Sequence, residues 1–182
     1  MTGRTFATLA VAVTICSASA LAAPREPDKP PVPAAPSADE QVKSLEQMCE
    51  ANAAARAARH AEKSLYERLG KDDGIHRLTK EVVRLHLVNP AIRHMFAGLD
   101  NDMVARHVAE FMISNLGGPP VYVDRPSLPD SHRRLKLTNA DFMAAGGDVI
   151  QALKNLKYGQ DEIDEVVCAL VGLRPMVVLA AE

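Results

Sequence analysis

The sequence predicts an exported protein whose mature chain forms one all-helical domain behind an N-terminal extension. Its 182 residues suit a single domain with extensions, and apolar residues make up 47%, which is enough for a core. Aromatic residues contribute only 4% and Trp is absent, so this core must consist mainly of Leu, Val, Ile, Ala and Met. Apolar residues recur at helical spacing, and no segment of convincing length alternates as a strand does. The net charge of -2 does not indicate nucleic acid or an anionic membrane surface as a partner.

The first 22 residues have the layout of a secretory signal peptide. Arg4 precedes an apolar run from Phe6 to Cys16, and small residues follow, ending in ALAAP. Cleavage is expected after Ala22, because Ala20 and Ala22 supply the small residues that the peptidase requires. A membrane anchor is the alternative, which the short apolar run disfavours. The sequence therefore predicts export to the periplasm.

Two further segments precede the compact domain. Residues 23–36 carry six prolines, which predicts an extended, semi-rigid linker. Ser37 and Glu40 then form a capping box, and we expect a helix over residues 37–63. Because this helix has few large apolar residues, it is expected to be solvated or docked by one narrow face. That face consists of Val42, Leu45, Met48 and Cys49.

The compact domain is expected over residues 64–182, and glycines divide its first part. A short helix over residues 65–70 stops at a glycine, and Gly74 is expected to break the chain again. A second helix is predicted over residues 75–87 from its apolar spacing. An Asn-Pro step then starts a short turn that ends at Phe96.

The second part of the domain is predicted to contain three longer helices and one long loop. The first helix is capped by Asp100 or Asn101 and ends before the GGPP sequence. A polar, proline-rich loop follows over residues 119–131; such a loop inside a compact domain is usually functional or held by a ligand. Thr138 or Asn139 caps the next helix, and the last helix covers residues 161–173, with an alternative end at Val178 beyond a proline.

Two cysteines, Cys49 and Cys168, remain after removal of the signal peptide. An exported protein permits a disulfide between them, which would tie the N-terminal helix to the last helix. The alternative is that both are unpaired and pack as small apolar residues. The sequence leaves both alternatives open.

One histidine lies on the apolar stripe of a helix. In the segment DNDMVARHVAEFMISN, the stripe is formed by Val104, Val108, Phe111 and Met112, and His107 points into it. A buried imidazole needs a partner, because an unsatisfied buried polar group costs roughly 1–3 kcal/mol. From spacing alone, a core histidine bonded to a backbone carbonyl is favoured over a functional group.

A second histidine, His132, follows the proline-rich loop, and spacing alone predicts an ordinary solvated loop residue. The remaining histidines are weaker candidates for a site. No cluster of His, Cys, Asp and Glu has the spacing of a structural zinc site, and no serine nucleophile, phosphate loop or dinucleotide motif is present.

From Ser64 to about Val178, the chain resembles the truncated haemoglobins of group I. The resemblance lies in five stretches, which occur in the order and spacing of that family. They are SLYERLGKDDGI, NPAIRHMFAGLD, ARHVAEFMISNLGGPP, SHRRLKLTNADF and DEIDEVVCALVGLRP. Each motif alone is weak, but jointly they are specific. The signal peptide, the linker and the helix of residues 37–63 lie outside the resemblance.

The resemblance implies a two-over-two helical sandwich around haem b, with His132 as the proximal ligand of the iron. It also implies that Phe96 packs on the haem face and that Phe142 lies under the haem. Arg133 and Arg134 are expected to pair with the haem propionates on the ground of charge alone. Covalent attachment of c-type haem is not indicated, because the chain has no C-x-x-C-H motif.

On the distal side of the haem, the sequence departs from many relatives. Val83 stands where many of them carry a tyrosine that hydrogen-bonds bound oxygen. His107-Val108 stands where many carry a His-Gln pair. We therefore expect an apolar distal pocket that includes Val104 and Phe111. In it, His107 either ligates the iron or bonds the iron's ligand.

These expectations favour reversible binding of oxygen, nitric oxide or carbon monoxide. An enzyme at the same haem, with nitric oxide dioxygenase or peroxidase-like activity, is a second hypothesis, which Val83 and Val108 disfavour. A haem-free helical interaction module, with the helix of residues 37–63 as its contact surface, is a third. A reductase of unknown identity is an expected partner, and the protein is expected to be a monomer or a weak dimer.

Overall fold

The computed structural model describes residues 35–179, which form only helices, turns and loops. They belong to one compact unit that begins at Ala35. The helices are α1 (Ala38–Ala51), α2 (Ala53–Glu62), α3 (Leu65–Arg68), α4 (Lys71–Val88), η1 (Arg93–Phe96), α5 (Asn101–Asn115), α6 (Leu128–His132), η2 (Arg133–Leu135), α7 (Asn139–Asn155) and α8 (Gln160–Val177). The prediction of an all-helical fold is confirmed.

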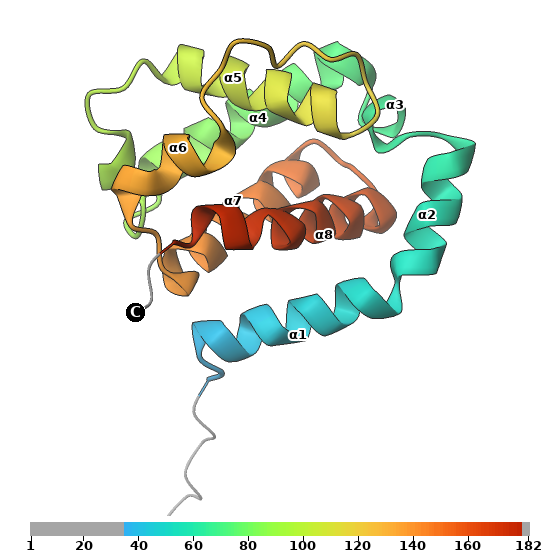
Figure 1. Cartoon of the computed structure of the whole chain (residues 1–182), viewed down its shortest axis with the longest axis horizontal. Coiled ribbons are helices and arrows are strands. Elements are labelled where there is room, and N and C mark those ends of the chain that lie inside the picture. Colours follow the sequence, from blue (N-terminus) through green and yellow to red (C-terminus); the bar gives the residue numbers. More distant parts are fainter. Residues whose placement is uncertain (1–34, 180–182) are drawn as a thin grey trace, which may run out of the picture. The chain divides into compact units, whose positions relative to one another are not determined.

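The core lies between two pairs of helices. The helices α4 and α5 form one pair, α7 and α8 form the other, and α4 also packs on α7 (Figure 1). The side chains of Leu69, Ile75, Leu78 and Leu153 are fully buried where these pairs meet. Helix α1 packs against α7 and α8, on the opposite side of this pair from α4 in Figure 1.

Several helix starts are set by side-chain caps at the predicted residues. Ser37 and Glu40 form the expected capping box of α1, with Glu40 N donating to Ser37 Oγ at 3.3 Å. Of the alternatives left open, Asp100 caps α5 and Thr138 caps α7, the latter in a capping box with Asp141. Each cap satisfies backbone N–H groups that have no partner within the helix.

The helix predicted over residues 37–63 is in fact two helices that meet at Asn52. The reason is that both halves reach α8: Cys49 of α1 bonds Cys168, and Arg59 of α2 bonds Glu165. A straight helix would separate residues 49 and 59 by about 15 Å, whereas residues three apart on α8 differ by about 4.5 Å in height. The bend at Asn52 brings both residues to neighbouring positions on α8.

Gly74 was expected to break the chain, but it lies inside α4, which begins at Lys71. The actual break is Gly70, whose φ of 88° lies in the left-handed region. Gly74 is instead a point of close approach, because a Cβ there would collide with the carbonyl oxygen of Leu69. The same carbonyl accepts a hydrogen bond from the hydroxyl of Tyr158 at 2.6 Å, so it has little freedom to move.

Cys49 and Cys168 are bonded to each other. The disulfide joins Cys49 to Cys168 with a Cα–Cα distance of 5.4 Å and closes 119 residues of chain. Both residues are buried, and so is Val42, while Leu45 and Met48 are partly buried. The predicted narrow face of α1 is therefore confirmed, and it is docked rather than solvated.

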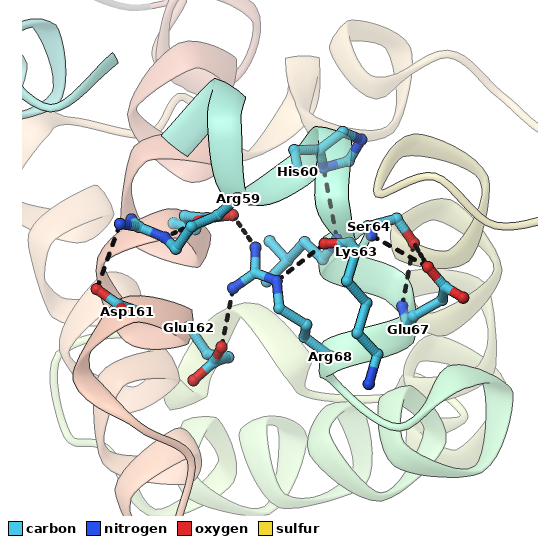
Figure 2. Close-up of polar contacts among 10 residues, drawn as sticks. Arg59, His60, Lys63, Ser64, Glu67, Arg68, Asp161 and Glu162 are labelled. Atoms are coloured by element: carbon cyan, nitrogen blue, oxygen red, sulfur yellow. Dashed lines mark hydrogen bonds and ion pairs between the residues drawn. The ribbon is translucent and has the colours of Figure 1, made fainter. Parts of the chain in front are cut away.

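A cluster of charged residues holds α2 and α3 on α8. The buried carboxylate of Glu165 accepts hydrogen bonds from Arg59, at 2.8 Å, and from Arg68. Arg68 also pairs with Glu162 at 2.8 Å, and Arg59 with Asp161 at 3.5 Å (Figure 2). Because α2 has no buried residue of its own, these contacts do most to fix its position.

The predicted signal peptide and all but the last two residues of the predicted linker lie outside the described residues. Within residues 35–179, none of the helices has the length and the apolar character needed to cross a membrane.

We expect Gly74→Ala to lower the free energy of unfolding by about 3 kcal/mol, because the new methyl group would be forced against the Leu69 carbonyl. Gly172→Ala in α8 is the matched control. A Cβ at Gly172 meets no atom within 4 Å, so this change should raise the free energy of unfolding by about 1 kcal/mol. Urea denaturation measures both, and equal effects would contradict the close packing at Gly74.

We expect Glu165→Ala to cost about 3 kcal/mol of stability, because it leaves the nearly buried Arg68 guanidinium without this carboxylate. Asp161→Ala is the control: this carboxylate is exposed, and its loss should cost less than about 1 kcal/mol. Limited proteolysis should cut α2 faster in the first variant only, since α2 then loses the bond from Arg59. Unchanged cleavage would show that α2 is held in another way.

Candidate functional site

Helix α5 has two apolar faces, and the predicted stripe is not the one that joins the core. The face toward α4 consists of the buried residues Ala105, Ala109 and Ile113. The predicted stripe of residues 104–112 lies beside this face and is only half-buried, and Val108 is 38% exposed. Small alanine side chains let α4 approach closely, so the larger side chains of the stripe remain available for another contact.

His107 lies on this second face, and its Nε2 atom is buried without a hydrogen-bond partner among the described residues. The interpretation of a core histidine bonded through this nitrogen to a backbone carbonyl therefore fails. An unsatisfied buried nitrogen is costly, so His107 remains a candidate for a ligand contact. Val104 and Phe111, one turn away on either side, are half-buried as well.

The long loop after α5 is anchored to that helix by contacts that the sequence did not reveal. The hydroxyl of Ser114 accepts hydrogen bonds from the backbone N–H groups of Val121 and Tyr122, at 2.9 and 2.8 Å. The ring of Tyr122 stands edge-on to that of Phe111, with centroids 5.3 Å apart. The loop was expected to be functional or held by a ligand, yet these contacts fix part of it through the protein alone.

His132 does not lie in the loop, as spacing predicted, but is the last residue of the short helix α6. Its Nδ1 lies 2.9 Å from the carbonyl oxygen of Leu128 and 3.2 Å from the hydroxyl of Ser131. Because a carbonyl can only accept, the proton of the neutral ring sits on Nδ1. Nε2 is then left with a free lone pair, which is the form of imidazole that binds a metal.

Phe96 packs against a polar pair that connects α4 to α7. Its ring lies 5.3 Å from the ring of His86, whose Nδ1 is 2.8 Å from Asp148 Oδ2. Asn89 donates to the same carboxylate at 2.9 Å. His86 is one of the weaker candidates of the sequence analysis, and nothing in the sequence identifies Asp148 as its partner.

The other predicted site residues lie in three different environments. Val83 is buried and lines a hollow of ≈ 220 Å³ between α4 and α5, together with Ala105. Phe142 is half-buried on the first turn of α7. Arg133 is exposed and donates to Asp130 at 2.8 Å, so its guanidinium is already partly engaged, and Arg134 is exposed as well.

The side chains of His107, His132 and their neighbours are of the kinds that would hold a haem. His132 presents a nitrogen that can ligate iron, and His107 presents a buried nitrogen in need of a partner. Val108 and Leu135 are each more than a third exposed, and a flat apolar ring would cover such side chains. Among the described residues, no group of three His, Cys, Asp or Glu side chains forms a separate metal site.

The model of the family described as bacterial-like globin matches residues 64–177. The fold is similar to that of the 2/2 haemoglobin from Synechococcus, at 28% identity over 64% of this chain and 99% of that one, with a TM-score of 0.59. It is also similar to the truncated haemoglobin from Tetrahymena pyriformis, at 22% identity over 65% of this chain and 100% of that one, with a TM-score of 0.60. No curated protein matches the sequence. The matched region spans α3 to α8, so the chain belongs to the bacterial-like globin family and has its truncated, two-over-two fold.

Proposed function

We propose that this protein holds haem b through His132 and reversibly binds diatomic ligands, as a group I truncated haemoglobin. The observation that carries the proposal is the hydrogen bond between His132 Nδ1 and Leu128 O, which leaves Nε2 free to ligate iron. When bound, the haem iron would supply the coordination chemistry that captures oxygen, nitric oxide or carbon monoxide. The long loop before α6, typical of group I, supports this assignment.

The residues around His132 prepare it for this role. The Leu128 carbonyl fixes the orientation of the ring and keeps the proton on Nδ1, which raises the donor strength of Nε2. Leu128 and His132 belong to the same helical turn, so the bond forms whenever α6 is folded. Ser127 caps α6 by accepting from Asp130 N, which stabilises that turn.

On the opposite side, His107 is the only one of the expected distal side chains that can donate a hydrogen bond or ligate iron. Val83, Val104 and Val108 supply neither. With one imidazole and no tyrosine or glutamine, the pocket would stabilise charge on a bound ligand through a single contact. This limited stabilisation favours ligand binding over nitric oxide dioxygenation.

We further propose that the protein works outside the cytoplasm. The disulfide between Cys49 and Cys168 supports this location, because disulfides persist in oxidising compartments. The narrow face of α1 is buried within the domain, which disfavours a haem-free module that uses this face to bind a partner.

Replacing the proposed iron ligand should remove the haem. We expect His132→Gly to lose most of its haem, because α6 contains no second histidine that could replace the imidazole. Imidazole added to the refolding mixture should restore a haem spectrum. The haem content is measured by the pyridine haemochrome assay, and His60→Gly in α2 is the control. Full haem content in His132→Gly would refute the proposal.

The role of His107 is tested by the absorption spectrum of the ferrous protein. If His107 ligates iron, the wild type should show a six-coordinate low-spin spectrum, and His107→Val should convert it to a five-coordinate high-spin one. If the wild type is already five-coordinate, direct ligation by His107 is excluded. In that case, the same variant should release oxygen roughly tenfold faster, as expected for one lost hydrogen bond. His60→Val should change neither property.

A further inference from the structure

We infer that α1 acts as a brace that positions the helix carrying His132, an inference that rests on the proposed role of His132. The brace consists of three residues of α1 and their partners on α7 and α8. The three pairs are Asp39–Asn139, Glu46–Arg174 and Cys49–Cys168. All of α1 lies outside residues 64–177, the part of the chain matched by the globin family.

Helix α6 needs support from its neighbours. It has five residues, none of which is buried, so it gains little stability from packing of its own side chains. Its contacts are with α8 and with the following 3-10 helix η2. The position of His132 therefore depends on where α8 and the chain after η2 are held.

The chain after η2 is held at Asn139, the first residue of α7. Its amide donates from Nδ2 to Asp39 Oδ1 at 2.7 Å, and its Oδ1 accepts from Arg174 Nη1 at 3.1 Å. Arg174 in turn donates from Nη2 to Glu46 Oε1 at 3.0 Å. Two carboxylates of α1 are thus connected, through one amide and one guanidinium, to the start of α7 and the end of α8.

The segment between His132 and Asn139 can transmit this constraint because its conformation is defined. η2 follows α6 without a gap, and Lys136 then takes a left-handed φ of 49°. Thr138 closes the segment with the capping box of α7. A shift in the start of α7 is therefore expected to move α6, and His132 with it.

The far end of α1 is fixed independently by the disulfide, and Val42 is buried between the two ends. The helix is thus attached along its length: polar contacts hold it at Asp39 and Glu46, and a covalent bond holds it at Cys49. Without the disulfide, these exposed polar contacts alone would be weak. The disulfide already holds the end of α1 on α8, so little further chain entropy is lost when the start of α1 contacts α7.

The test is amide hydrogen exchange on the full mature chain in the form in which it purifies. We expect Asp39→Ala with Glu46→Ala to speed exchange over residues 128–137 roughly tenfold, as for one or two lost hydrogen bonds. Cys49→Ala with Cys168→Ala should do the same. In the Asp39→Ala with Glu46→Ala variant, which leaves the core and the disulfide intact, exchange in α4 and α5 should stay as in the wild type. Gln47→Ala, an exposed residue on the same helix, is the control.

A second readout tests the consequence for the haem. In the holoprotein, both brace variants should transfer haem to excess apomyoglobin about tenfold faster than the wild type and the Gln47→Ala control, a typical effect of losing support around a metal ligand. The iron–histidine stretching frequency of the photolysed carbonmonoxy protein should shift as well.

The two proposals fail in different ways. A wild type that purifies without haem and does not take it up refutes the proposed function, and hydrogen exchange still decides whether the brace exists. A haem-loaded wild type whose brace variants keep normal exchange over residues 128–137 refutes the brace. In the Asp39→Ala with Glu46→Ala variant, faster exchange spread equally over α4 and α5 also refutes it, because α1 would then stabilise the whole fold rather than position α6.

Discussion

The attachment of the N-terminal helices to α8 is the constraint on which the outer part of the structure depends. Within about one turn of α8, Glu165 accepts hydrogen bonds from two arginines and Cys168 forms the disulfide with Cys49. The first contact holds α2 and α3, and the second holds α1. Helix α8 therefore anchors α1 and α2, which lie outside the region matched by the family. The bend at Asn52 lets both helices contact α8 at residues only three positions apart.

The separation of the two faces of α5 explains how one helix can serve both the core and the site. Ala105 and Ala109 make the contact with α4 short, so the core needs no large side chain from α5 there. The larger residues and His107 lie on the neighbouring face, where they are only half-buried.

Local signals predicted much of the fold, and distant contacts account for what they missed. Caps such as Ser37, Asp100 and Thr138 act within one turn, and the sequence identified them. Gly74 failed as a predicted break because its role is set by the Leu69 carbonyl, just after α3, and by Tyr158, which lies between α7 and α8 and bonds that carbonyl. The disulfide stayed open for the same reason, since two cysteines 119 residues apart carry no local sign of pairing.

Local signals predicted less of the candidate site. His132 had no distinguishing local feature, and only the resemblance over the whole domain identified it. The hydrogen bond from its Nδ1 to Leu128 O was not predicted either, because residues 119–131 were expected to form a loop, whereas Leu128 and His132 lie on the helix α6. The pair of His86 and Asp148 was not implicit in the sequence, since 62 residues separate them and only the packing of α4 on α7 brings them together.

The two sides of the site differ in how firmly the protein holds them, and this difference bears on function. His132 is fixed by its own helical turn, by the anchored loop before it and by the capped start of α7 after it. His107 has no partner that fixes its ring through Nε2. In the proposed function, a firmly held His132 on one side would allow the unsatisfied imidazole of His107 to engage iron or to yield to an external ligand without disturbing His132. Ligand exchange would then be controlled at His107, while the retention of haem would be controlled at His132 and the helices that support it.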